Sequence, residues 1–237
     1  MHYSFNVQHV VFAFGILAST ESPAIADAPA TSTDATELMH RVASAYAQTA
    51  HGVVGVRSQS LLTIKAPVFH RRIANEGWFV FVDGTLAMSS ESRDPRQPPL
   101  RDPYRAEYAR DYAFAYAPCP SCSPGTAAVA FSSPLHDVEH ASGQLVIDLD
   151  TALIVSQTEK PYKLPWPTQD GQLVATWGRV GGGWFPETIA GAFVGRIGPF
   201  VGHATYAQSL SSYNYYPNVE TAAVALRQGA APVAVGR

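Results

Sequence analysis

The sequence is poor in charge and in long apolar runs. Only 15% of its 237 residues are Asp, Glu, Lys or Arg, the formal net charge is −3, and no block of Lys or Arg occurs. Nucleic acids and anionic membrane surfaces attract clusters of basic side chains, so the composition favours neither partner. No apolar stretch reaches the roughly 18 residues of a membrane-spanning helix, so we expect no transmembrane segment in the mature chain.

Motifs of nucleotide sites and of common hydrolases are also missing. The sequence contains no phosphate-cradling loop and no dinucleotide fingerprint. His203 is near Ser209 and Ser211 in the chain, but no nucleophile elbow or assigned acid accompanies them. Four acidic residues fall at expected strand ends and turns, where Asp commonly stabilises the turn: Asp137, Glu139, Asp148 and Asp150. We therefore expect neither catalysis nor a cofactor.

The first 26 residues have the pattern of an export signal. An apolar run over residues 10–18 is followed by small residues that end at Ala24-Ile-Ala26, a plausible cleavage pattern. We predict a signal peptide over 1–26, a linker over 27–33 and an exported, periplasmic mature protein. Residues 1–9 carry no Lys or Arg, so the alternative is a disordered apolar N-terminus.

One long helix is expected directly after the linker. Asp34 and Glu37 match a capping box, apolar residues follow at helical spacing to about Ala50, and Gly52 can end the helix in the left-handed conformation. From Val54 the pattern changes to a period of two, which predicts a long strand to residue 64.

Short apolar runs separated by turn residues predict strands through most of the remaining chain. The Asp-Gly pair at 83–84 predicts a hairpin between residues 78–82 and 85–88. Further strands are expected at 68–74, 126–131, 143–149, 153–160, 172–180, 184–189, 194–206 and 210–216. We predict an α+β fold of mostly antiparallel β structure. It is an unclosed half-barrel or strongly curved sheet, covered by one long N-terminal helix and a short second helix.

Two loops and a tail interrupt this pattern. Residues 89–105 are rich in Pro and Arg, so we expect a flexible, exposed loop outside the core. Tyr104, Tyr108 and Tyr112 follow at helical spacing and predict a short helix that leads into a strand, with the aromatic side chains in the core. Residues 217–237 are expected to be a frayed tail with a weak helix at 219–226.

The second loop, over residues 118–125, contains both cysteines. Cys119 and Cys122, together with His136 and His140, have the spacing of a structural zinc site. The intervening residues read as a strand rather than a compact zinc-finger unit, and an oxidising compartment favours disulfides. We predict a Cys119–Cys122 disulfide, with free thiols and a zinc site as the alternatives.

The order of several segments resembles the outer-membrane lipoprotein carrier and lipoprotein-sorting superfamily (LolA/LolB-like). Residues 65–71, Lys-Ala-Pro-Val-Phe-His-Arg, are similar to a family segment that leads to a strand ending in Asp-Gly, here Asp83-Gly84. Residues 143–148, 184–186 and 213–216 look like the second half of the family. The resemblance covers a single domain over 34–216. Loops 89–105 and 118–125 are not part of the family pattern, so the chain resembles a divergent member.

The resemblance implies a non-catalytic periplasmic protein that holds a lipid, an acyl chain or a lipoprotein in its curved sheet, with envelope proteins as further partners. Arg71 is the nearest match to a basic residue that holds the helical lid in the family, and Arg57 is the second candidate. The proposed ligand-binding residues are Val56, Phe69, Arg71, Trp78, Phe79, Phe81, Trp177 and Trp184. Alternation divides them between two faces, so only some can line a cavity. The alternative is an envelope interaction module with a filled core that acts through its loops.

Overall fold

The computed structural model describes residues 32–67, 69–90, 99–180 and 183–228. The expected signal peptide over 1–26 and most of the expected linker lie outside the described residues. The elements are α1 (Ser32–Thr49), β1 (Val53–Ala66), β2 (Phe69–Val82), β3 (Thr85–Ser89), the short 3-10 helix η2 (Ala109–Asp111), β4 (Ala113–Ala117), β5 (Thr126–Ser132), β6 (Ala141–Asp148), β7 (Ile154–Pro161), β8 (Thr168–Val180), β9 (Gly183–Ile197), β10 (Phe200–Tyr216) and α2 (Val219–Gln228).

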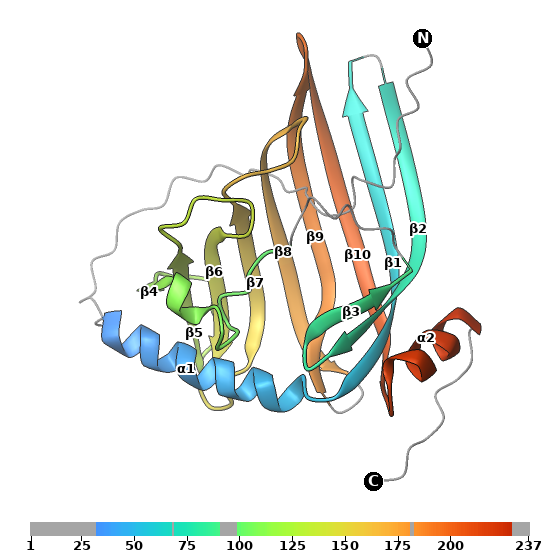
Figure 1. Ribbon diagram of the computed structural model, residues 1–237. Coiled ribbons are helices and arrows are strands. Elements are labelled where there is room, and N and C mark those ends of the chain that lie inside the picture. Colours follow the sequence, from blue (N-terminus) through green and yellow to red (C-terminus); the bar gives the residue numbers. More distant parts are fainter. Residues whose placement is uncertain (1–31, 68, 91–98, 181–182, 229–237) are drawn as a thin grey trace.

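The strands form one ten-stranded antiparallel sheet that does not close (Figure 1). Their order is β3-β2-β1-β10-β9-β8-β7-β6-β5-β4. Strands that are consecutive in the sequence pair with each other, except β3 and β4, which form the two edges, and β1 also pairs with β10. This confirms the predicted mostly antiparallel α+β fold with an unclosed, curved sheet.

Each helix covers a different face of the sheet. We call the face that carries α1 the inner face and the face that carries α2 the outer face. Directly opposed residues of neighbouring strands share a face, and one such row crosses nine strands on the inner face. From β2 to β4 it consists of Ile73, Leu62, Tyr206, Gly191, Leu173, Glu159, Gly143, Phe131 and Phe114.

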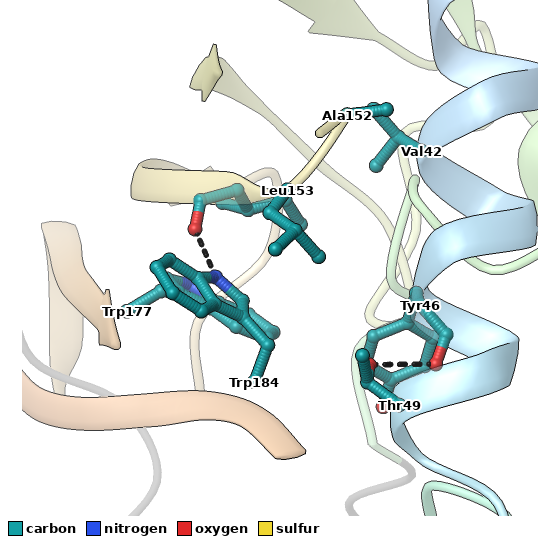
Figure 2. Close-up of a pocket in the computed structure, with 8 residues that line it drawn as sticks. Val42, Tyr46, Thr49, Ala152, Leu153, Trp177 and Trp184 are labelled. Atoms are coloured by element: carbon teal, nitrogen blue, oxygen red, sulfur yellow. Dashed lines mark hydrogen bonds between the residues drawn. The ribbon is translucent and has the colours of Figure 1, made fainter. Parts of the chain in front are cut away.

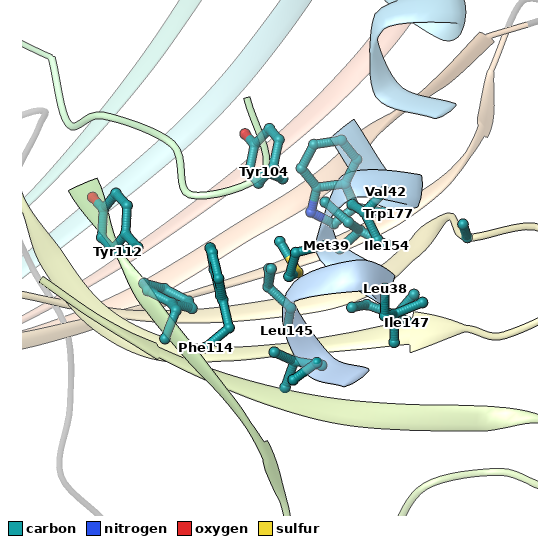
Figure 3. Packing of buried hydrophobic residues seen from close by; sticks show 14 of the residues in the cluster. Leu38, Met39, Val42, Tyr104, Tyr112, Phe114, Leu145, Ile147, Ile154 and Trp177 are labelled. Carbon is teal, nitrogen blue, oxygen red and sulfur yellow. The ribbon is translucent and has the colours of Figure 1, made fainter. Parts of the chain in front are cut away.

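Helix α1 lies across the lower ends of the strands, as oriented in Figure 1. Leu38, Met39 and Val42 are almost fully buried and join side chains from β4 to β8 in the largest hydrophobic cluster (Figure 3), which we call the lower core. The helix begins at Ser32, so Asp34 belongs to its first turn, where a negative charge suits the helix dipole. It ends at Thr49, and Gly52 has a φ of 93°, as predicted.

The turn between β2 and β3 is tied to the end of α1. Asp83 and Gly84 have φ values of 48° and 75°, and they form the predicted Asp-Gly turn. The Gly52 amide donates to the Asp83 carboxylate at 2.8 Å, and the Asp83 amide donates to the Gly52 carbonyl at 2.9 Å. A methyl group on Gly84 would come within 2.6 Å of the Tyr46 hydroxyl oxygen. The turn therefore needs glycine for its conformation and for its packing.

Several predicted strand boundaries are wrong. Residues 68–74 and 78–82 were expected as separate strands, but β2 runs without a break over Phe69–Val82. Residues 194–206 were expected as one strand, whereas the chain reverses at Gly198, which has a φ of 60°. The Gly-Pro pair at 198–199 is a turn signal that the predicted boundaries did not take into account. The breaks expected at 190–193 and 207–209 are absent, so the strands 184–189, 194–206 and 210–216 are replaced by the two long strands β9 and β10.

The second helix is C-terminal, and it packs on the sheet. Residues 104–112, where a short helix was expected, contain only turns and the three-residue η2. The weak helix expected at 219–226 corresponds to α2, which buries Ala222 and Leu226 against Val80 on the outer face. Residues 229–237 of the expected tail lie outside the described residues. Arg57 donates to the carbonyl of Leu226 at 3.2 Å and so holds the C-terminal end of this helix.

Candidate functional site

The inner face continues above α1 as a second apolar surface. Its buried members are Leu62, Phe193, Ala204 and Tyr206, and half-buried side chains pack around them: Ile64, Ile73, Leu164, Leu173 and Ile189. We call this set the upper cluster. These residues belong to the long strands β1, β2, β8, β9 and β10 and to the loop before β8. None of them joins α1 in the lower core.

Side chains of the described residues occupy most of the space beneath α1. A small pocket between α1 and the sheet is lined by Val42, Tyr46, Thr49, Ala152, Leu153, Ile154, Trp177 and Trp184 (Figure 2). It leaves only about 10 Å³ for the centre of a water molecule, which is close to the minimum for one water. The indole of Trp184 donates to the Ile154 carbonyl and closes one side. This pocket is too small for an acyl chain in this conformation.

The end of the Pro-rich segment belongs to the lower core, which corrects the expectation that residues 89–105 lie wholly outside it. Residues 91–98 are not described, but Pro103 is fully buried and Tyr104 is 6% exposed. The Tyr104 ring is 4.9 Å from the ring of Tyr46 and 5.4 Å from that of Trp177, with edge-to-face geometry in both pairs. Such pairs add to the free energy gained from burial alone.

Polar contacts fix this segment at both ends. Arg105 donates to the Gly84 carbonyl at 3.0 Å and to the Thr85 hydroxyl at 2.7 Å. Arg101 contacts the carboxylates of Glu139 at 2.6 Å and Asp111 at 3.2 Å. The segment is thus fastened to the β2–β3 turn at one end and to the loop before β6 at the other.

Two carboxyl groups, one in this segment and one beside it, have raised pKa values. Glu159 belongs to the apolar row of the inner face, and its Oε1 is shielded from water with no hydrogen-bond partner among the described residues. Burial, followed by the charge of Asp102, raises the pKa of Glu159 to about 8. Burial likewise raises the pKa of Asp102 to about 6, although Arg105 and a hydrogen bond from Tyr104 act in the opposite direction. Glu159 is therefore mostly neutral at pH 7.

The predicted ligand-binding residues do not form one site. Trp177 and Trp184 belong to the lower core, whereas Val56, Phe79 and Phe81 form another inner-face cluster near the lower ends of β1 and β2.

Three remaining candidates lie elsewhere. Trp78 is on the outer face beneath α2, opposite Arg57, so neither side chain faces the inner surface. Phe69 and Arg71 are exposed at the upper end of the sheet. Arg57, rather than Arg71, is the basic residue that bonds to the backbone of a helix, and that helix is α2.

The sequence reasoning missed the upper cluster and Glu159. Leu62, Leu173 and Ile189 were recognised as strand residues, but nothing in the alternation showed that they share one surface. The alternation within 153–160 gave no signal for Glu159, because residues 156–160 are all polar. The partner strands that make it part of an apolar row are set only by the register of the sheet.

The predicted disulfide between Cys119 and Cys122 is present. The disulfide contradicts the zinc alternative, because zinc binding needs both sulfurs as thiolate ligands. His136 stacks on Tyr162 with a ring distance of 4.2 Å, and the Nδ1 of buried His140 is 2.7 Å from an Asp137 oxygen. Among the residues that the structure describes, no group of three or more His, Cys, Asp or Glu is placed to hold a metal ion.

We expect the double variant Cys119→Ser/Cys122→Ser to lose at most about 2 kcal/mol of unfolding free energy, because the disulfide closes a very short loop. The loop joins the lower ends of β4 and β5, far from the upper cluster, so uptake of an apolar probe should not change. Urea denaturation of the variant and of the oxidised wild type measures the first effect. A much larger loss would show that the loop stabilises more than its own conformation.

The described residues contain no helix that is long and apolar enough to cross a membrane. No family model matches the sequence, and no curated protein sequence matches it.

Solved structures with a similar arrangement are found at low sequence identity. A LolA superfamily protein from Nitrosomonas europaea is 8% identical with a TM-score of 0.41, and the match covers 77% of this chain and 96% of that chain. An outer membrane lipoprotein-sorting protein domain from Vibrio parahaemolyticus is 6% identical with a TM-score of 0.43, covering 84% and 98%. A DUF1329 family protein from Desulfovibrio piger is 8% identical with a TM-score of 0.41, covering 79% and 94%.

Proposed function

We propose that this protein is an exported, non-catalytic binding protein that holds an apolar ligand, such as a lipid or an acyl chain, against the upper cluster. The observation that carries this proposal is an apolar inner surface that continues beyond the part covered by α1. Its half-buried members Ile64, Ile73 and Ile189 still have apolar area to bury. Burying each methylene of a ligand there contributes roughly 0.8 kcal/mol.

Glu159 gives this surface an ionisable group. It lies opposite Leu173 in the apolar row, and its raised pKa leaves it protonated at neutral pH. A neutral carboxyl group can donate a hydrogen bond, so Glu159 is suited to the carbonyl of an ester or an amide at the head of an acyl chain. A charged carboxylate at this position would repel such a ligand.

Export is part of the same proposal. The N-terminal pattern predicts a cleaved signal, and a disulfide is stable in an oxidising compartment such as the periplasm. We assign residues 34–216 to one domain, to which α2 adds a packed C-terminal helix.

A second function is favoured by the filled space beneath α1. If the upper cluster is also filled, the protein acts as an envelope interaction module through its loops rather than as a carrier. The two functions differ in one measurable property, the uptake of an apolar molecule by the folded protein.

The test compares two neighbouring residues of β9 that point to opposite faces. Ile189 is half-buried in the upper cluster, whereas Ala190 is exposed on the outer face. We expect Ile189→Glu to reduce uptake of a fluorescent fatty acid by at least tenfold, because a carboxylate on the apolar surface must lose its hydration when the ligand binds. Ala190→Glu adds the same charge and should bind like the wild type.

Native mass spectrometry of the protein purified from its export compartment is the companion measurement. A stoichiometric acyl-bearing mass, absent from folded Ile189→Glu, would support the carrier function. A wild-type protein that purifies without ligand and takes up no fatty acid would favour the interaction module.

A further inference from the structure

Four large apolar side chains face water at the upper end of the sheet. Phe69 begins β2, Trp166 belongs to the loop before β8, and the β9–β10 turn is flanked by Ile197 and Phe200. Their exposed fractions are 46%, 77%, 47% and 48%, respectively. In Figure 1, β1, β2, β9 and β10 extend upward, away from α1, to this end of the sheet.

The register of the sheet makes these turns neighbours. Phe69 is opposite Ala66 in β1, and the adjacent Lys65 is opposite His203 in β10. On the other side, the amide of Arg196 donates to the carbonyl of Pro167 at 2.9 Å, which places the loop of Trp166 beside β9. The exposed apolar residues therefore lie on adjacent turns at one end of the strands, and we call this end the tip.

The tip is strongly basic, although the whole protein has a net charge of −3. Residues 62–75, 160–172 and 193–206 contain six Lys or Arg and one acidic residue, a formal charge of about +5: Lys65, Arg71, Arg72, Lys160, Lys163, Arg196 and Asp170. Asp170 is 2.9 Å from Lys160, so this pair is neutralised locally. Lys65, Arg71, Arg72, Lys163 and Arg196 are exposed.

We propose that the tip docks onto an anionic phospholipid surface. Projecting Trp, Phe and Ile side chains can enter the headgroup region, while the surrounding Lys and Arg contact lipid phosphates. Each property alone is common on protein surfaces, but their combination on projecting turns fits a bilayer interface. An acidic protein would account for the charge and would leave the 77% exposed ring of Trp166 without a role.

This inference goes beyond ligand binding, because docking requires no bound ligand. It also gives the upper cluster a position relative to the membrane. Ile64 of the upper cluster is opposite Arg71 of the tip, so the apolar inner surface begins where the basic edge ends. A lipid that leaves the bilayer at the tip would meet this surface first.

The test is co-sedimentation of the full mature protein with vesicles. We expect binding to phosphatidylcholine vesicles that contain phosphatidylglycerol, weak binding to pure phosphatidylcholine, and a loss of binding at high salt. The double variant Arg71→Gln/Arg72→Gln should bind at least tenfold more weakly, because each basic residue near an anionic surface changes binding roughly fivefold. Arg110→Gln/Arg179→Gln removes the same charge from exposed sites outside the tip and is the matched control.

The apolar part of the tip is tested in the same assay. Trp166→Ser/Phe200→Ser should weaken binding by at least tenfold, whereas Val224→Ser, at a 47% exposed residue of α2, should have no effect. All replaced side chains are exposed, so the variants should keep the circular dichroism spectrum of the wild type. Control variants that lose as much binding as the tip variants would overturn the proposal. So would a wild type that ignores anionic vesicles but binds immobilised polyglutamate, since that result assigns the charge to an acidic protein partner.

Discussion

Replacing Tyr104 with alanine should lower the free energy of unfolding by about 3–5 kcal/mol, the range for removing a large aromatic side chain from a core. Its ring lies between those of Tyr46 and Trp177, beneath α1, and is 6% exposed. The variant would leave a space beside the small pocket of the lower core, because α1 and the sheet are each held by other contacts. Urea denaturation measures the loss.

Tyr108 is the matched control for this experiment. It belongs to the same segment and is half-buried, and its ring lies 5.5 Å from the guanidinium carbon of Arg101 and 5.8 Å from that of Arg105. Cation–π contacts at such sites contribute about 1 kcal/mol, so Tyr108→Ala should cost far less than Tyr104→Ala. Equal losses in the two variants would mean that residues 99–108 are an exposed loop, as their composition alone suggests.

The variant Tyr104→Ala also tests whether the space beneath α1 can hold a small apolar molecule. If an apolar molecule can occupy the lower core once the phenol ring is removed, the folded variant should bind benzene or a similar small apolar probe that the wild type does not bind. Engineered apolar cavities behave in this way. This measurement is independent of fatty-acid uptake at the upper cluster, which the variant should retain.

Raising the pH from 5 to 8 should destabilise the protein, and Glu159→Gln should remove most of this effect. The pKa of Glu159 is raised to about 8 in the folded protein, above the usual value of 4.5 that applies when the chain is unfolded. Between these two values the folded state binds more protons than the unfolded state, so the free energy of unfolding falls as the pH rises. Asp102, with its pKa raised to about 6, adds to the fall below pH 6.

The expected loss for Glu159 is on the order of 3 kcal/mol between pH 5 and pH 8. Glu159→Gln keeps the shape of the protonated side chain but cannot ionise. The variant should therefore match the wild type at pH 5 and exceed its stability at pH 8. Urea midpoints at pH 5, 6.5 and 8 measure this difference.

Glu76→Gln is the control for the pH experiment, because Glu76 is exposed and its carboxylate accepts a hydrogen bond from the surface residue Gln59 at 3.3 Å. Its pH profile should follow that of the wild type. A Glu159→Gln profile that also follows the wild type would show that Glu159 is hydrated in the folded protein. In that case the proposed hydrogen bond from its neutral form to a ligand would lose its basis.

Local sequence patterns were sufficient for most elements of this fold. The capping residues and apolar spacing after Thr33 predicted α1 to within two residues at its start. The period of two after Val54 predicted β1, and the Asp-Gly pair predicted the turn before β3. These features depend on backbone preferences and on hydrogen bonds within a few residues, which the sequence specifies directly.

The packing of two segments was misjudged. Residues 99–105 have the composition of an exposed loop, yet Pro103 and Tyr104 complete the lower core. The C-terminal segment has a weak helical pattern, yet Val80 and neighbouring side chains of the outer face bury α2. In both cases the free energy of burial comes from residues distant in the chain, and no local preference opposes it strongly.

By itself the sequence determined the antiparallel strands, the N-terminal helix and the main hairpin, and it favoured the disulfide between Cys119 and Cys122. Only the tertiary structure decided which residues share a surface. It placed Glu159 in an apolar row, separated Trp78 from Trp177, and gathered Lys65 and Arg196 at one edge, although no basic block occurs in the chain. The physical reason is that alternation sets the direction of a side chain relative to its own strand. The order and register of the strands, which depend on contacts across the whole chain, decide what lies beside it.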